Sequence, residues 1–277
     1  QLVIATACDL SPAEVTYQQL IELYAPTALL ASALEIHHAY TLVHDDLPCM
    51  DNDEWRRGKI ATHKKFGEWQ ALLAGDGLLN ASYRMISMIE HPNLPRLFKV
   101  ITWALGPKGL IQGQVLDLSS SKLDSFQLLK KTHQLKTARL IQSAIVGGML
   151  LIDSNHHPNR LLLDMYKLGN GIGVLFQLLD DLSELEQPSI STHELSVNGW
   201  IKHPSESISE ALRDIETVEN LLDRYQMSVM RKSIAHYLNT METKINKGQE
   251  SISNHLEKNG GIKVADLRPL MSALNRI

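Results

Sequence analysis

The sequence lacks the features that define several common protein classes. Only two of its 277 residues are cysteine, Cys8 and Cys49, so the chain predicts no disulfide framework and fits a reducing compartment. The 27 lysine and arginine residues do not outnumber the 31 acidic ones, and the net charge of −4 argues against nucleic-acid binding. The apolar runs are interrupted by polar residues or glycine and fall short of the roughly 20 residues that span a membrane. We therefore expect a cytoplasmic protein with no stable membrane anchor and no nucleic-acid partner.

Signals for β-strands are also scarce. Aromatic residues make up 5% of the chain, and apolar residues recur at helical rather than alternating spacing. Neither an interdomain linker nor an internal repeat is visible, so the sequence predicts one all-α domain over 1–277, with a cavity between apolar central helices. The expected helices are Ala28–Asp45, Trp69–Tyr83, Leu135–Met149, Leu161–Glu186, Ser205–Tyr225 and Met230–Lys258. The expected breaks are Asp9–Pro12, His91–Pro95, Leu105–Gly109, Asn155–Pro158 and Pro188–Pro204.

The sharpest motif follows the first of these helices. The run HDDLPCMDNDE, from His44 to Glu54, contains five acidic residues. The negative end of a helix dipole disfavours carboxylates, which suggests that a cation such as Mg²⁺ compensates them. Asp45 and Asp51 would face apart on a straight helix, so they can converge only if the backbone turns near Pro48. A solvated acidic turn is the alternative interpretation.

Basic residues come next, in the run WRRGK. The forked guanidinium groups of Arg56 and Arg57 suit bidentate phosphate binding, which suggests that metal ions and a diphosphate share one site. The alternative is mutual neutralisation at the surface, and for Lys64 and Lys65 we favour that interpretation.

A second acidic site has regular helical spacing. Gln177, Asp180 and Glu184 share one helix face, where the two acids repel each other unless a cation joins them. Three glycines between positions 169 and 173 would allow another helix or a ligand to approach closely. Alternatively, the helix runs out into solvent after Leu179.

Between the two acidic sites, Lys136 lies in an otherwise apolar helix. It needs an anionic partner, because a buried unpaired ammonium is costly. We interpret Gln114 and Asp117 as supporting rather than catalytic residues. His38 precedes Asp45 by two helical turns and is expected on the same face.

Together these motifs resemble the trans-isoprenyl (polyprenyl) diphosphate synthases, and most closely the bacterial farnesyl diphosphate synthase group. The matching segments are Leu34–Gly67, Ala74–Leu79 (AGDGLL), Gly113–Leu118 (GQVLDL), His133–Ile141 (HQLKTARLI) and Gly171–Asp181 (GIGVLFQLLDD). The resemblance implies an isoprenoid-synthase-type helical bundle around a deep central cavity, usually homodimeric. It also implies condensation of isopentenyl diphosphate with dimethylallyl or geranyl diphosphate to give geranyl or farnesyl diphosphate.

The resemblance also implies roles for residues at the matching positions. The metal-binding residues, for three Mg²⁺ ions with substrate bound, would be Asp45, Asp51 and Asp180, assisted by Asp46, Asp181 and Glu184. The allylic diphosphate would contact Arg56, Lys136, Thr137 and Gln177, and isopentenyl diphosphate would contact His38 and Arg57. Asp45, Asp51, Lys136 and Asp180 would be the catalytic residues. Tyr40 and Thr41 would limit product length, favouring farnesyl over longer chains.

Three departures from the family pattern are visible. A basic segment of the family would lie before Gln1, and because the pattern resumes at Leu2–Thr6, we expect N-terminal residues to be missing. Glu184 stands where the family has aspartate, and Trp200 replaces a lysine that would meet the diphosphate, with Lys202 its candidate replacement.

These departures keep two alternatives open. Glu184 and Trp200 motivate the first, a weakly active or non-catalytic partner subunit of the same family. The second is an Mg²⁺-dependent allylic diphosphate lyase or cyclase. Arg57 and His38 argue against the second, because a cyclase has no second diphosphate to hold.

Overall fold

The computed structural model describes residues 1–11, 17–119, 121–152, 159–187, 190, 195, 198–274 and 276–277. The expected break at Asn155–Pro158, and the prolines Pro12 and Pro188 of two other breaks, lie outside these residues.

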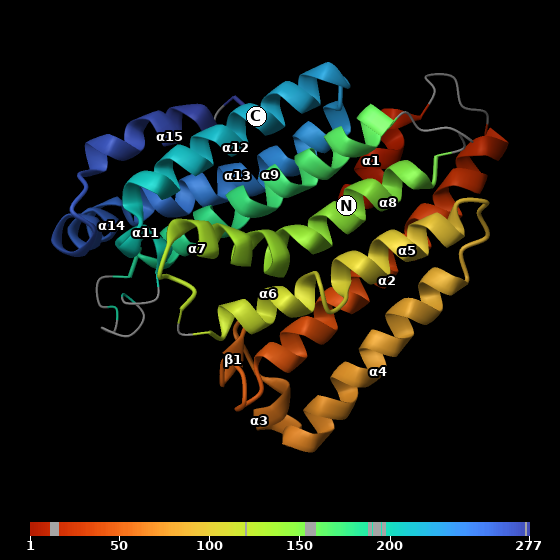
Figure 1. Ribbon diagram of the computed structural model, residues 1–277, viewed down its shortest axis with the longest axis horizontal. Helices are drawn as coiled ribbons and strands as arrows, with labels where there is room; N and C mark the ends of the chain where they lie inside the picture. The colour runs from red at the N-terminus through yellow and green to blue at the C-terminus, as the bar shows by residue number, and fades with distance from the viewer. Residues whose placement is uncertain are drawn as a thin grey trace.

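The described residues form a helical bundle, shown in Figure 1, that confirms the expected all-α class. The N-terminal half contains α1 (Leu2–Leu10), α2 (Tyr17–Asp45), α3 (Thr62–Phe66), α4 (Glu68–Ser87), α5 (Leu94–Leu105), α6 (Leu110–Asp117) and α7 (Phe126–His133). The π-helical turn η1 (Gln134–Ala138) leads into α8 (Arg139–Leu150), which precedes α9 (Asn159–Glu184). The C-terminal part contains α11 (Gly199–Lys202), α12 (Pro204–Arg224), α13 (Ser228–Lys247), α14 (Gln249–His255), the π-helical η2 (Leu256–Gly260), the 3-10 turn η3 (Val264–Leu267) and α15 (Arg268–Leu274).

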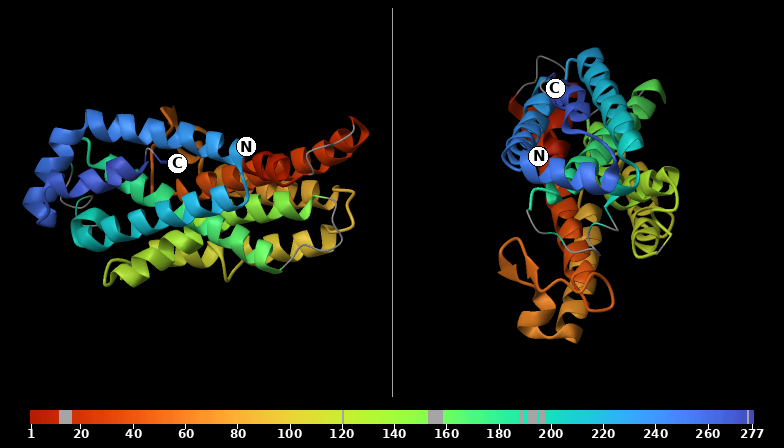
Figure 2. Two further views of the ribbon diagram at one scale, coloured as in Figure 1. Left: turned by 90° about the horizontal axis from the view of Figure 1, so that it is seen from above. Right: turned by 90° about the vertical axis from the view of Figure 1, so that its left-hand side faces the viewer.

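Helices α8 and α9 form the centre of the bundle. They pack against each other, α1 packs on α8, and α12 packs on α9 (Figures 1 and 2). Ile145 and Met149 of α8, and Leu168 and Leu179 of α9, are completely buried. Full burial of such a side chain contributes roughly 1.5–3 kcal/mol. The expectation of central helices that are apolar on most faces is therefore confirmed.

Helices α2 and α4 pack along each other on one side of this centre. Helix α2 begins well before the expected Ala28 and contains Pro26, but it ends at Asp45 as expected. None of the described helices is long and apolar enough to cross a membrane.

A short hairpin follows the first acidic motif and was not expected from the sequence. Its strands, β1 (Trp55–Arg56) and β2 (Lys59–Ile60), pair antiparallel. Arg57 (φ 52°) and Gly58 (φ 74°) make the left-handed two-residue turn that suits such hairpins. The strands are too short to show an alternating pattern, which is why strand signals in the sequence missed them.

The C-terminal helices also differ from expectation. The single helix expected over Met230–Lys258 is divided at Gly248, which ends α13. A Cβ at Gly248 would lie 2.4 Å from Cβ of Glu186, so glycine permits close packing on the segment after α9. Within the expected break Pro188–Pro204, Gly199–Lys202 form the short helix α11.

Candidate active site

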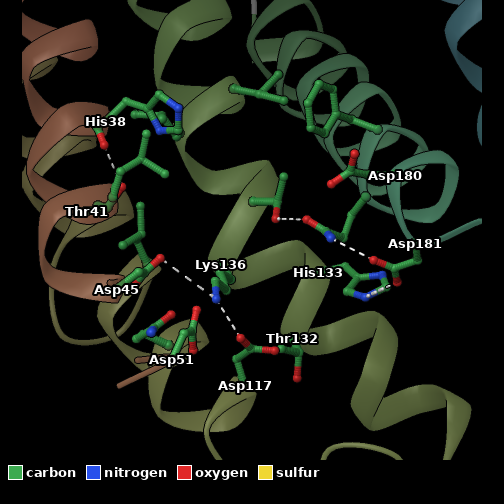
Figure 3. Close-up of a pocket in the computed structure, with 18 of the residues that line it drawn as sticks. His38, Thr41, Asp45, Asp51, Asp117, Thr132, His133, Lys136, Asp180 and Asp181 are labelled. Atoms are coloured by element: carbon green, nitrogen blue, oxygen red, sulfur yellow. Dashed lines mark hydrogen bonds and ion pairs between the residues drawn. The ribbon is translucent and has the colours of Figure 1, made fainter. Parts of the chain in front are cut away.

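A cavity of about 1480 Å³ opens beside α2, α9 and η1 and is lined by both acidic sites. Figure 3 shows Asp45 and Asp51 on one side, Asp180 and Asp181 on the other, and Lys136 between them. The sequence therefore placed these residues around one cavity correctly. The depth of the cavity is apolar, since Leu140, Ile141 and Ala144 of α8 line it as well.

The first acidic cluster is closed by a backbone turn. The helical pattern stops at Asp45, and the N–H of Asp51 donates to the carbonyl of Asp45 at 2.9 Å. Asn52 adopts a left-handed conformation (φ 55°), and its N–H donates to the carbonyl of Leu47 at 3.1 Å. The chain thus turns around Pro48 and brings Asp51 beside Asp45, as the sequence required.

The carboxyl groups of this cluster are poised to bind a cation. Burial raises the pKa of Asp45 to about 6, against the opposing charge of Lys136 and with a further contribution from Asp51. Burial likewise raises the pKa of Asp51 above its usual range. Burial thus destabilises the charged form of both side chains more than Lys136 stabilises it, so a further positive charge between them would be favourable.

Unlike Asp45 and Asp51, Asp46 does not line the cavity. It is 3% exposed, and one of its carboxylate oxygens accepts a hydrogen bond from Nε of Arg56 at 2.8 Å. Arg56 also donates to Asp53 at 2.7 Å and itself lines the cavity. Asp46 therefore orients Arg56, and its place in the structure is behind the cavity wall.

Arg57 extends from the hairpin turn toward α2. Its guanidinium lies 3.4 Å from Nε2 of His38, which lines the cavity on the same helix face as Asp45. The two residues expected to bind isopentenyl diphosphate thus lie together. By contrast, Lys64 forms an ion pair with Glu54 at 2.7 Å, in line with the surface neutralisation that we favoured for it.

Lys136 lies at the centre of the site, in the π-helical turn η1 (Figure 3). Its ammonium is 2.5 Å from Asp117 of α6 and 3.9 Å from Asp45, so it has the anionic partners that its burial requires. A Cβ at Gly113 would lie 2.2 Å from the backbone nitrogen of Lys136, so this glycine allows α6 to approach η1. Asp117 is the supporting residue expected from the sequence.

The second acidic cluster is held by a chain of hydrogen bonds. Thr137 donates to the side chain of Gln177 at 2.8 Å, and Gln177 donates to Asp181 at 2.8 Å. Nε2 of His133 lies 3.5 Å from the same carboxyl group, and burial lowers the pKa of His133 to about 4. Asp181 therefore connects α7, η1 and α9.

Asp180 points into the cavity, and Glu184 also lines it. Burial raises the pKa of Asp180, and the charge of Lys244 on α13 opposes the rise. Burial and the nearby charge of Glu184 raise the pKa of Asp181 well above its usual range. At this site, as at the first, burial outweighs the nearby positive charge. Because Leu182, Ser183 and Leu185 are buried, the alternative of a helix that runs into solvent after Leu179 is wrong.

Trp200 is not a cavity residue. It is fully buried, and its indole N–H donates to the carbonyl of Leu178 at 2.6 Å. Lys202 is exposed and does not line the cavity. The interpretation of Lys202 as a replacement for the family lysine is therefore not supported.

The structure adds residues that sequence reasoning missed. Lys122 lines the cavity and lies 3.0 Å from Asp117. Ser233, Ile234, Tyr237 and Lys244 of α13 also line it. Their spacing along α13 is helical, but nothing in the sequence links this helix to the acidic motifs.

The carboxylates of the two acidic clusters are suitable ligands for Mg²⁺. Their donors are the hard carboxylate oxygens that this ion prefers. No group of three acidic, histidine or cysteine side chains within the described residues forms a ready-made metal cage. Mg²⁺ typically takes one or two carboxylates together with phosphate oxygens and water, and Asp45, Asp51 and Asp180 are carboxylates that line this cavity.

The two residues expected to limit product length also line the cavity. Tyr40 is 7% exposed and makes edge contacts with the rings of His37 (4.6 Å) and His44 (5.6 Å). Thr41 lies on the face of α2 that bears His38 and Asp45 (Figure 3). Tyr40 is thus a rigid part of the wall, fixed between two imidazole rings.

Comparisons with known proteins place these features in a family. Residues 5–193 match the sequence profile of the polyprenyl synthetases. Over 172 residues the chain is 36% identical to a farnesyl diphosphate synthase of Buchnera aphidicola, and over 173 residues it is 39% identical to a dimethylallyltranstransferase of Fischerella ambigua. These alignments cover 59% and 60% of this chain but 60% and 48% of the relatives, so the match spans about half of their length.

The fold of this chain is also similar to that of a solved structure. It is a geranyltransferase of Helicobacter pylori in complex with magnesium and isoprenyl diphosphate. The two share 26% sequence identity at a TM-score of 0.60, over 93% of this chain and 81% of the other.

Proposed function

The chain belongs to the polyprenyl synthetase family, and from this premise we propose that it is a short-chain trans-prenyltransferase. It condenses isopentenyl diphosphate with dimethylallyl or geranyl diphosphate to give geranyl or farnesyl diphosphate. The single observation that carries the proposal is the pair of acidic clusters on opposite sides of one cavity, with Lys136 between them and apolar side chains beneath.

Asp45, Asp51 and Asp180 would hold Mg²⁺, with three ions when substrate is bound, and Asp46, Asp181 and Glu184 would assist. The bound ions would supply electrostatic stabilisation for the negative charge of the leaving diphosphate. Asp46 and Asp181 assist by position, since they hold Arg56 and Gln177.

The chain's own cations and polar groups bind the substrates. Lys136, Arg56, Thr137 and Gln177 contact the allylic diphosphate, and their charges and dipoles favour the diphosphate as its negative charge grows. His38 and Arg57 bind isopentenyl diphosphate beside it.

The reaction then follows from ionisation. The allylic C–O bond breaks, and its electron pair leaves with the diphosphate. The alkene of isopentenyl diphosphate attacks the carbocation, and a proton passes from the adduct to the departing diphosphate. The apolar walls formed by Leu140 and Ile141 keep water from the cation, and Tyr40 and Thr41 limit the length of the growing chain.

We propose that 1–277 form one synthetase domain that acts in the cytoplasm as a homodimer. Packing of α12 on α9 joins the segment after the family match to the bundle. Both cysteines are free and exposed, which suits a reducing compartment. Exposed apolar side chains on α4, α5 and α6 provide a surface for a second copy: Trp69, Leu73, Trp103 and Val115.

One assay tests the proposed reaction. Full-length protein is incubated with Mg²⁺, labelled isopentenyl diphosphate and either dimethylallyl or geranyl diphosphate. We expect elongated product that disappears when Mg²⁺ is chelated. Diphosphate release without elongation would indicate a lyase or cyclase, and no turnover at all would indicate a non-catalytic partner subunit. Light scattering of the same preparation measures whether it is a dimer.

A further inference from the structure

Helix α13 forms a wall of the cavity although it lies beyond residues 5–193, the part that matches the family. Tyr237 fixes its position: its ring stacks on Phe176 of α9 at 4.4 Å, and its hydroxyl donates to the carbonyl of Phe176 at 3.1 Å. Two turns further along α13, Lys244 also lines the cavity.

The ammonium of Lys244 lies at the edge of the second acidic cluster. It donates to Oγ of Ser183 at 3.0 Å and forms a longer ion pair with Glu186 at 3.7 Å. Ser183 in turn donates to the backbone carbonyl of Asp180 at 2.8 Å. Its side chain remains 40% exposed, and within the described residues these are its only polar contacts, so it retains the capacity to bind a ligand.

The other cations of the cavity are already paired with acidic side chains. Within the described residues, four lysine and arginine side chains line the cavity. Arg56 pairs with Asp46 and Asp53, whereas Lys122 and Lys136 pair with Asp117. Lys244 is the one of the four that comes from α13 and donates to a side chain of α9, that of Ser183, although the charge of Lys122 also lowers the pKa of Asp181.

A diphosphate held between the two clusters needs positive charge on both sides. Trp200 is buried in the core, and Lys202 is exposed and does not line the cavity, so α11 brings no ammonium to it. The position of Lys244 beside Ser183 supplies one from a different helix. Its flexible four-carbon chain can reach from Ser183 toward an oxygen of a ligand at Asp180.

We propose that Lys244 is a substrate-binding residue that donates to the allylic diphosphate at the second acidic cluster. This inference rests on the proposed function. The diphosphate replaces Ser183 and Glu186 as the partner of the ammonium, so the contact strengthens as the leaving group gains charge. Lys244 would thereby bind the same anion as Lys136, from the opposite side of the cavity.

The test compares Lys244→Gln with Lys244→Arg and with Lys247→Gln. Lys247 lies on the same helix, is exposed and does not line the cavity, so its variant controls for loss of one charge from α13. A charge-assisted hydrogen bond corresponds to about tenfold or more in binding. We expect Lys244→Gln to raise the KM for the allylic diphosphate by about that factor while the KM for isopentenyl diphosphate stays constant. Lys244→Arg should recover most of the loss, and Lys247→Gln should behave as the wild type.

A binding measurement separates this inference from the proposed reaction. Inorganic diphosphate with Mg²⁺ is titrated into each full-length variant in a calorimeter, without turnover. Weaker binding by Lys244→Gln alone supports the inference even if the wild type makes no product. Equal affinities for Lys244→Gln and Lys247→Gln would overturn it, even if the wild type condenses both substrates.

Discussion

The first acidic cluster is assembled from one short stretch of chain, whereas the second takes its partners from four other elements. Asp45, Asp51 and the pair Asp46–Arg56 lie between the end of α2 and β1, and one backbone turn brings them together. The second cluster depends on contacts of α9 with α7, η1, the segment before α11, and α13: His133, Thr137, Asn198 and Lys244. A local cluster can be recognised as a motif, but a distributed one is complete only in the folded chain.

The largest expected effect follows from removing a carboxylate of the local cluster. Asp45→Asn should lower kcat by about a thousandfold or more, because the leaving diphosphate loses its main metal anchor. Asp180→Asn should cost less, because Glu184 remains in the second cluster. Single-turnover product formation measures both, with circular dichroism as the control for folding. Equal losses of kcat would show that the two clusters contribute equally to stabilising the leaving diphosphate. A near-normal rate for Asp45→Asn would mean that the site is misplaced.

A second comparison is between Asp46 and Asp181, the carboxylates that hold other side chains in the two clusters. Asp46→Asn removes the charge that orients Arg56, and Asp181→Asn removes the acceptor of Gln177. We expect each to weaken kcat/KM for the allylic diphosphate about tenfold, the effect of one charge-assisted hydrogen bond. The number of bound metal ions, measured by equilibrium dialysis with Mn²⁺, should not change. Loss of an ion in Asp46→Asn would identify that carboxylate as a direct ligand instead.

The metal affinity of the first acidic cluster, at Asp45 and Asp51, should also depend on pH. A carboxyl group must lose its proton to bind Mg²⁺, and the pKa of Asp45 is raised to about 6. Metal affinity should therefore be full above about pH 7 and fall as the pH drops through about 6, well above the range of an ordinary aspartate. Lys136→Gln removes the charge that opposes the shift, so its midpoint should move to higher pH. Calorimetric titration of Mg²⁺ with inorganic diphosphate across this range is the measurement, with Asp45→Asn as the control for protonation of the diphosphate itself. The same pH profile in Asp45→Asn and the wild type would contradict the assignment.

The smallest expected effect on rate is at the cavity wall. Tyr40→Ala should leave both acidic clusters intact and lengthen the product, because the ring held between His37 and His44 no longer blocks the chain. Chromatography of the dephosphorylated products measures chain length. Leu163→Ala, at an exposed position of α9 outside the cavity, is the matched control and should not change it. An unchanged product from Tyr40→Ala would show that another part of the wall sets the limit.

The sequence predicted the bundle, the turn near Pro48 and the need of Lys136 for an anion, because each depends on neighbours along the chain or on helical periodicity. It could not show that Asp46 and Asp181 serve other side chains, since their partners are set by packing. The burial of Trp200 could not be predicted from the sequence, because its environment comes from the contact of α11 with α9. Lys244 was missed because no motif marks α13, and only the close packing at Gly248 and Tyr237 brings that helix to the cavity.

The most direct test of the account is a crystal structure with Mn²⁺ and a thio-analogue of the allylic diphosphate that cannot ionise. Anomalous scattering locates each metal ion independently of the protein atoms. The account predicts Mn²⁺ at Asp45 and Asp51, and again at Asp180, with one diphosphate bridging the ions across the cavity. Metal at only one of the two clusters, or a diphosphate bound away from both, would contradict it.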